Sequence, residues 1–180
     1  QMCIRDRNTI LNSLANQLNL NYDDRGRRAE KGKLINNLYH ELEYISYYNL
    51  KPPKSLGVEW VKENLQIILK KYLDKPVEDL LHTYTTHSAN QIAKNLDNIS
   101  SVLITGGGTY NRFLISKISQ RTNCEIIIPS TDIIDYKEAI IFAFLSVLKI
   151  RGEVNCFANV TGSKHDHSSG KIFLPNRSID

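Results

Sequence analysis

The chain has 180 residues, 41% of them hydrophobic, and a formal net charge of +4 at pH 7. That apolar fraction is enough for a hydrophobic core, which excludes a wholly disordered chain. Basic side chains gather at Arg25, Arg27 and Arg28, where acidic residues are interleaved. Because nucleic-acid binding needs clustered basic charge and a recognisable motif, we expect no nucleic-acid partner.

The cysteines and the longest apolar run indicate the compartment. Cys3, Cys124 and Cys156 are widely spaced and match neither a zinc site nor a disulfide scaffold. No signal peptide is expected either. Widely spaced cysteines without a disulfide pattern are typical of proteins in the reducing cytoplasm. The apolar run at 139–148 is far shorter than the ~20 residues needed to span a bilayer. We therefore expect a cytoplasmic protein with no membrane partner.

The first half of the chain is predicted to be mainly helical. Residues 1–7 differ in texture from the segment that follows, and we expect a non-native leader there. Pro52 and Pro53 exclude a helix interior, so a loop is expected around them. Elsewhere apolar residues mostly recur at helical spacing, and Pro76 suits the first turn of the last helix. The helices expected are 8–20, 25–31, 35–48, 61–72 and 76–96.

The pattern changes near residue 99, where a βαβ unit is predicted. Short apolar runs bounded by turn residues indicate buried strands at 102–105 and 125–129. A helix is expected between them at 110–120. Strands joined by such a crossover are parallel, and the crossover is right-handed.

The rest of the chain is predicted to complete an α/β fold. Residues 136–150 are apolar nearly all round, which predicts a helix packed on both sides. A short strand is expected at 171–174. We expect residues 99–180 to be the α/β nucleotide-binding part and to form one compact unit with the mainly helical part at 8–98.

Three consecutive glycines, Gly106, Gly107 and Gly108, separate the first strand from its helix. Glycine permits positive φ and removes every Cβ from the loop, and the helix N-terminus offers unpaired N–H groups. A nucleotide or its phosphates can approach such a surface closely, although a strand-to-helix turn without a ligand has the same pattern. Asn111 is expected either to cap the helix or to bond a base or ribose.

A second interpretation of this loop is a dinucleotide-binding site. Residues 106–111 nearly fit the Gly-x-Gly-x-x-Gly pattern, but Asn111 replaces the third glycine, which permits close packing of helix on strand in that fold. Asp132 lies beyond the second strand, where such folds carry the ribose-binding acid. The alternative is therefore an NAD(P)-binding Rossmann-like domain that uses Gly106, Gly108 and Asp132.

Other candidate groups lie in the last third of the chain. Glu138 stands directly before the apolar run, where an ionised carboxylate is unfavourable unless it is partnered. A buried carboxylate near a cleft can act as a base or bind sugar hydroxyls. His165 and His167, with Asp166 between them, lack a partner cluster of further ligands, so a solvated loop is expected there and no metal site. His82 and His87 are expected to have packing or surface roles.

Four segments resemble, in the same order, motifs of the anhydro-N-acetylmuramic acid kinase family. They are similar to its P-P-K-S-x-G-x-E loop, its strand followed by G-G-G-x-x-N, its x-E-A helix and its closing S-V-T-G, in which Asn159 here replaces Ser. Their joint occurrence is more specific than any one of them, and together they resemble the C-terminal half of the family's members. The segments are Pro52–Glu59, Leu103–Asn111, Lys137–Leu145 and Asn159–Gly162.

The resemblance implies a fold and an activity. The fold is one lobe of an actin/hexokinase-like ATPase, with a βαβ core, a helical insertion and the N-terminal lobe missing. The activity is that of a kinase that uses ATP, Mg²⁺ and water to open the ring of 1,6-anhydro-N-acetylmuramic acid. The product is N-acetylmuramate 6-phosphate, formed in peptidoglycan recycling. The partners implied are the sugar and the missing lobe, and a homodimer is left open.

The resemblance also implies roles for individual residues. Glu138 would lie near the sugar and the reacting water, as a catalytic residue. Lys54 and Ser55 would help to shape the substrate side of the cleft. The adenosine side would be formed by Gly106, Gly107, Gly108 and Asn111.

Two motifs of the family do not occur in these 180 residues. One is its phosphate loop, G-x-M-S-G-T-S-x-D-G, and the other is the aspartate of F-D-x-x-P-x-N, the general base, whose final Asn aligns with Asn8. Phosphoryl transfer depends on positioning and on neutralising the phosphates. We therefore expect residues 1–180 alone not to turn over.

Overall fold

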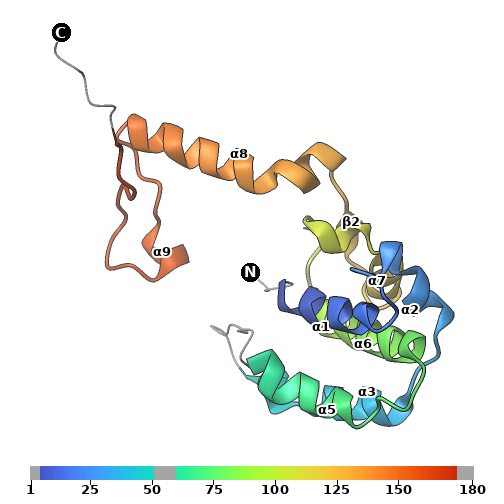
Figure 1. Ribbon diagram of the computed structural model, residues 1–180. Helices are drawn as coiled ribbons and strands as arrows, with labels where there is room; N and C mark the ends of the chain where they lie inside the picture. The colour runs from blue at the N-terminus through green and yellow to red at the C-terminus, as the bar shows by residue number, and fades with distance from the viewer. Residues whose placement is uncertain (1–4, 51–59, 174–180) are drawn as a thin grey trace. The chain divides into compact units, whose positions relative to one another are not determined.

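The computed structural model describes residues 5–50 and 60–173 (Figure 1). Contacts within the chain fall into two compact units, Gln1–Ser130 and Thr131–Asp180. We call these the first and the second unit and describe each by itself. The structure is a mixed α/β arrangement, mostly helical, with a small parallel sheet.

The first unit begins with helices that follow the hydrophobic spacing closely. The helix expected at 35–48 divides into two because Ile45 is extended, with φ −62° and ψ 117°. Pro76, with ψ 136°, lies at the N-cap of its helix and not in the first turn. The helical segments are α1 (Arg5–Asn16), η1 (Asp24–Gly26), α2 (Arg27–Lys31), α3 (Asn36–Glu43), η2 (Ser46–Asn49), η3 (Val61–Leu65), α5 (Gln66–Lys70) and α6 (Val77–Ala93).

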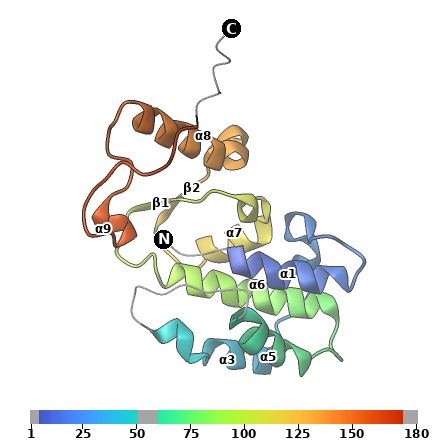
Figure 2. The same ribbon diagram turned by 60° about the vertical axis from the view of Figure 1, so that its left-hand side comes forward.

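Helix α6 is the centre of the first unit. It passes between α1 on one side and α3 on the other, and it also packs against α2 (Figures 1 and 2). Leu80, Leu81 and Tyr84 are buried, and so are the polar Thr83 and His87. A helix whose successive positions are buried is enclosed nearly all round, unlike a surface helix with a single apolar stripe.

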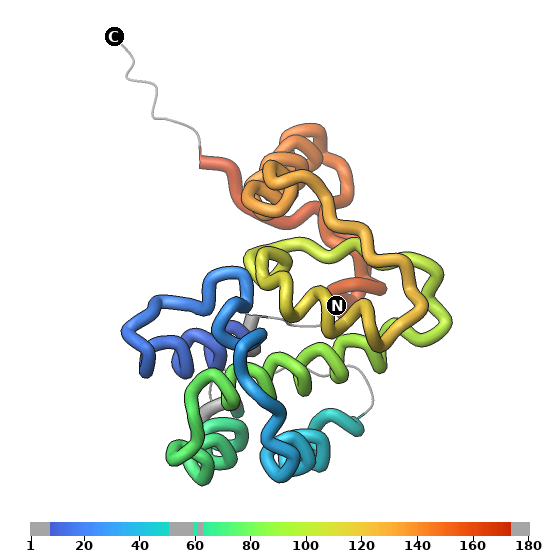
Figure 3. The backbone as a smooth tube through the Cα atoms, turned by 90° about the vertical axis from the view of Figure 1, so that its right-hand side faces the viewer, coloured from blue at the N-terminus to red at the C-terminus, as the bar shows by residue number. Residues whose placement is uncertain are grey.

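The predicted parallel βαβ unit is confirmed, but the expected burial of its strands is not found: Leu103 is 57% exposed and Ile127 is 42% exposed. Strands β1 (Ser101–Leu103) and β2 (Glu125–Ile127) pair in parallel, with Val102 opposite Ile126. The crossover consists of η4 (Gly107–Tyr110) and α7 (Arg112–Ser119). Helix α7 packs on α6, as the tube in Figure 3 shows for the yellow and green segments.

The second unit consists of one long helix and a looped tail. Helix α8 spans Thr131–Ile150 and α9 spans Ala158–Thr161. Cys156 and His167 form an antiparallel bridge. The expected strand at 171–174 is not found at 171–173, and Leu174 lies outside the described residues. The tail pairs with itself around the bridge, and no ladder partner is described for residues 171–173.

The expectation that α8 is packed on both sides is wrong for this chain. Phe142 is 67% exposed and Ile150 is 74% exposed. The second unit covers little of the helix: Lys149 Nζ donates to the carbonyl of Ser168 (3.2 Å), and Asn155 Nδ2 donates to that of Leu145 (3.3 Å). Apolar residues around the helix therefore lack neighbours to bury them. Within the described ranges, no helix is both long and apolar enough to cross a membrane.

We predict that Gly32→Ala destabilises the first unit. A Cβ at Gly32 would lie 2.1 Å from the carbonyl oxygen of Glu78 on α6, and that oxygen belongs to backbone that cannot rotate away. Overpacking of this kind lowers the free energy of unfolding by about 1–3 kcal/mol. Urea unfolding followed by circular dichroism measures the loss.

The matched control is Gly107→Ala. A Cβ there would meet nothing within 4 Å, so its free energy of unfolding should stay within about 0.5 kcal/mol of the parent value. Equal losses in the two variants would contradict the close approach of α2 to α6.

Candidate functional site

The glycine loop, Gly106–Gly108, follows β1 and includes the first two residues of η4, and it is open to solvent on part of its surface. Gly106 has φ +88° and ψ 171°, a region that is essentially restricted to glycine. A Cβ at Gly106 or Gly107 would meet no atom within 4 Å. The backbone of the loop is therefore accessible to a ligand at these two positions.

Both ends of the loop are fixed by hydrogen bonds. On the strand side, the N–H of Ile104 donates to the carbonyl of Ile127 (3.0 Å) and continues the pairing of β1 with β2. Within the turn, Thr109 N donates to Gly106 O at 2.9 Å. On the helix side, Asn111 Oδ1 accepts from the N–H of Leu114 at 2.9 Å. The open backbone is thus held between two ordered elements.

Asn111 performs the capping role that the sequence allowed for. Its Oδ1 lies against Gly26, where an added Cβ would come within 2.2 Å of it. Gly26 also has φ +75°, so both the conformation and the close approach favour glycine. A contact between Asn111 and a base or ribose stays a prediction.

Thr109 gives a test of whether the loop suits a polar ligand. Its side chain is buried, with 6% exposed. In the part of the chain that the structure describes, no hydrogen-bond partner is found for its Oγ1. Buried polar atoms are normally satisfied, and a nucleotide offers hydroxyl and ring-nitrogen partners. The open backbone at Gly106 and Gly107 is therefore the feature of the loop that fits the close approach of a nucleotide.

Of the other predicted site residues, the structure describes two, and both belong to the second unit. Glu138 and Asp132 lie on α8 in the second unit, and both are exposed. The expected burial of Glu138 is not found, because the apolar residues that follow it are exposed themselves. Lys54 and Ser55 lie outside the described residues.

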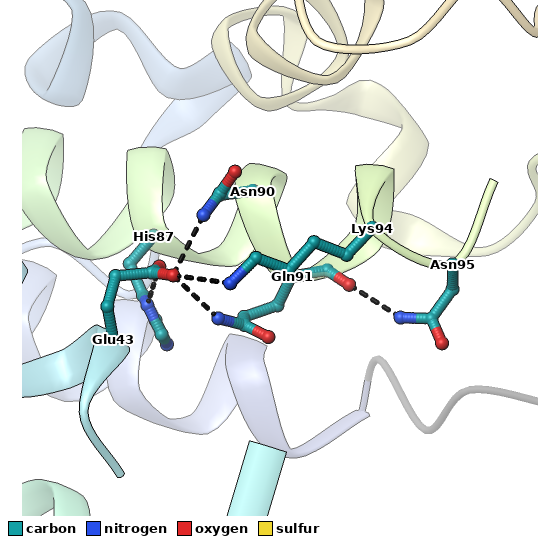
Figure 4. A network of polar contacts seen from close by, with 6 residues as sticks. All are labelled: Glu43, His87, Asn90, Gln91, Lys94 and Asn95. Carbon is teal, nitrogen blue, oxygen red and sulfur yellow. Dashed lines mark hydrogen bonds and ion pairs between the residues drawn. The ribbon is translucent and has the colours of Figure 1, made fainter. Parts of the chain in front are cut away.

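A cluster of hydrogen bonds around the carboxylate of Glu43 was not predicted from the sequence. It joins α3 to α6, and we call it the hub. Glu43, at the end of α3, accepts four hydrogen bonds from α6 and the residue after it (Figure 4). His87 Nδ1 donates to Oε1 at 2.7 Å. Three donors share Oε2: Asn90 Nδ2 at 2.8 Å, Gln91 Nε2 at 3.0 Å and Lys94 Nζ at 2.8 Å.

The hub holds Glu43 in its ionised form. Burial raises the pKa of Glu43, but hydrogen bonds from His87 and Lys94 and the electrostatic interaction with these two residues outweigh it and lower the pKa from 4.5 to about 2. Since a carboxylate only accepts hydrogen bonds, His87 must carry its proton on Nδ1. The imidazole is 1% exposed, so this arrangement is structural: it fastens α3 to α6.

One sequence signal could have found the hub. His87, Asn90, Gln91 and Lys94 follow the spacing i, i+3, i+4 and i+7, which places them on one face of a helix. Such a polar stripe needs a shared acceptor when the helix is buried. That acceptor lies in α3, far away in the sequence, and the spacing of the polar stripe does not predict its position.

The tail histidines face each other without forming a metal centre in the described ranges. The rings of His165 and His167 lie 5.8 Å apart, edge to face. Among residues 5–50 and 60–173, no group of three His, Cys, Asp or Glu side chains is placed to hold a metal ion. His167 instead pairs through its backbone with Cys156.

A family model described as anhydro-N-acetylmuramic acid kinase matches residues 6–175. The chain belongs to this family. It is 32% identical over 168 residues to an anhydro-N-acetylmuramic acid kinase of Caldanaerobacter subterraneus, covering 86% of this chain and 42% of the relative. A relative of that name from Francisella tularensis subsp. novicida is 34% identical over 165 residues, covering 86% and 43%. One from Bacillus cereus is 29% identical over 184 residues, covering 93% and 48%.

The chain thus spans about half the length of the curated relatives it matches. The matched residues include both the glycine loop and Glu138. The family assignment does not favour the alternative of an NAD(P)-binding domain that uses Asp132.

We predict that Glu43→Gln destabilises the first unit at pH 7 by about 2–3 kcal/mol, the order implied by the lowered pKa. A carboxyl group whose folded pKa lies below its unfolded pKa stabilises above the unfolded value. That stabilisation is lost as the pH falls from 4.5 towards 2. The difference in unfolding free energy between parent and variant should therefore shrink over this window, measured by urea unfolding at each pH.

Glu63→Gln is the matched control, because Glu63 is exposed. It should change the free energy of unfolding by less than about 0.5 kcal/mol. A Glu43→Gln loss that stays constant from pH 7 to pH 2 would contradict an ionised hub.

Proposed function

We propose that this chain forms part of an ATP-dependent kinase that acts on anhydro-N-acetylmuramic acid in the cytoplasm. The proposal is supported by the family match and by the names of the relatives. The structural observation that carries it is the open glycine loop between β1 and α7. The reaction would open the 1,6-anhydro ring with water and phosphorylate the sugar to N-acetylmuramate 6-phosphate.

The glycine loop would contact the adenosine part of ATP, within one lobe of an actin/hexokinase-like fold. Gly106 and Gly107 leave room for close approach of a planar base or a ribose. Thr109 would satisfy its buried hydroxyl with a polar atom of the nucleotide. Asn111 would hold the start of α7 in place through its cap. When bound, ATP supplies the phosphoryl group.

Glu138 would act on the sugar side. Its carboxylate on α8 is exposed, in contrast to the burial that the sequence suggested, so it can bind a sugar hydroxyl or orient water. Lys54 and Ser55 would help to shape this side of the cleft. No described residues are grouped to hold Mg²⁺, and we assign that ion to no side chain here.

A second lobe would complete the cleft. The relatives are about twice as long as this chain. Neither the family's phosphate loop nor its general-base aspartate occurs in these residues. Because phosphoryl transfer needs the phosphates positioned and neutralised, residues 1–180 alone should bind nucleotide without turnover. A homodimer would join two copies of the complete protein.

We predict that the 180-residue chain binds ATP and that Gly107→Val weakens this binding at least about tenfold. A valine side chain would fill the space that the loop leaves open, and one lost close contact of about 1.4 kcal/mol is a factor of ten in affinity. Isothermal titration calorimetry with ATP, and with NAD as the competing ligand class, measures both affinities.

Ser119→Val, at the exposed C-terminal end of α7, is the control and should bind ATP like the parent. Tighter binding of NAD than of ATP would contradict the proposal. So would formation of N-acetylmuramate 6-phosphate by the 180 residues alone, since it would place the complete machinery within them.

A further inference from the structure

A cavity of about 320 Å³ opens beside the start of α7, within the first unit. It lies where η1 and α2 approach α7. Its volume falls in the range of small-molecule sites, about 300–1,000 Å³. The lining residues are Arg25, Arg27, Glu30, Arg112, Phe113 and Ser116.

The lining carries an excess of positive charge. Three arginines and one acidic residue, Glu30, are among the lining residues. Arg27 also pairs with Asp24 at 3.5 Å, but both side chains are more than half exposed, and such pairs contribute little. Lys117 does not line the cavity, but its Nζ lies 5.1 Å from the centre of the ring of Phe113, which does, and adds a further cation nearby. The cavity therefore attracts anions.

The shape and charge of the arginine side chains that line the cavity favour phosphate over other anions. Guanidinium presents a planar fork of donors that matches phosphate, and it remains charged at any physiological pH. Arg112 is the first residue of α7, where the helix dipole favours negative charge. Ser116 lies one turn further and offers a hydroxyl on the same face. Phe113 is buried and gives an apolar floor.

We propose that this cavity binds the phosphate group of a small phosphorylated molecule. The inference does not depend on the proposed function, because it rests on the arginine lining alone. The phosphate has two conceivable sources: the phosphate chain of a nucleotide bound at the adjoining glycine loop, or a separate phosphorylated sugar. Gly26, which follows Arg25, contacts Asn111 at the end of that loop, so the two surfaces adjoin.

The test uses the whole 180-residue chain and tripolyphosphate as the probe. Calorimetric titration should give saturable binding that weakens with added salt. Arg112→Gln and Arg25→Gln should each reduce the affinity about tenfold, the effect of losing one charge-assisted contact. Arg28→Gln is the charge-matched control: Arg28 pairs with Glu78 at 3.6 Å and does not line the cavity. It should bind tripolyphosphate within about twofold of the parent.

Competition then distinguishes the sources. Displacement of ATP by tripolyphosphate, with adenosine binding unaffected, assigns the cavity to the nucleotide's phosphates. Simultaneous binding of both assigns it to a separate phosphorylated ligand. Either result supports the proposal.

Absence of tripolyphosphate binding by the parent would overturn the proposal, and so would an equal loss in Arg28→Gln, which would reflect net charge alone. Thermal unfolding of each variant checks the fold. Amide chemical shifts of Glu30 and Ser116 in the parent give a second readout, because binding in the cavity must move both.

Discussion

The enclosure of α6 is the constraint on which the rest of the first unit depends. Helices α1, α2, α3 and α7 all pack on it, so each is positioned by the same surface. Enclosing a helix that carries polar side chains is favourable only if those groups are bonded. Glu43 meets part of this need by accepting four hydrogen bonds from one face, two of them from the buried His87 and Gln91. Among the described residues, the buried hydroxyls of Thr85 and Thr86 on the same helix have no hydrogen-bond partner.

The position of the glycine loop depends on the packing of helices around α6. Helix α7 is held against α6, and its first turn is capped by Asn111, whose oxygen lies against Gly26. The strand side is held by the pairing of β1 with β2. A binding surface works best when an accessible segment is supported by ordered neighbours, and the open backbone at Gly106 and Gly107 has such support at both ends. The arginine-lined cavity includes the start of α7, so the two proposed ligand-binding surfaces depend on one helix.

Local signals predicted the βαβ unit well. Its apolar runs, its glycines and the capping Asn111 are all read within a few residues of one another, and no distant partner is needed to interpret them. The family resemblance was likewise carried by short motifs, and the match over residues 6–175 bears it out.

Contacts between residues far apart in the chain could not be predicted from the sequence. The partner of the polar stripe on α6 lies in α3, 44 positions before His87, and no periodicity indicates it. The exposure of α8 was missed for the same reason: an apolar helix predicts burial, but its own sequence does not show which residues pack on it. Within this chain the side chains of Phe142 and Ile150 are exposed, and Glu138 is exposed with them.

Hydrogen–deuterium exchange with and without ATP tests the central claim most directly, because it locates the nucleotide on the chain without any substitution. The account predicts that ATP slows exchange at the amides of 104–112 and leaves the interior of α6, already protected by burial, unchanged. Saturation with ATP that leaves 104–112 exchanging at the free rate, while another segment becomes protected, would contradict it.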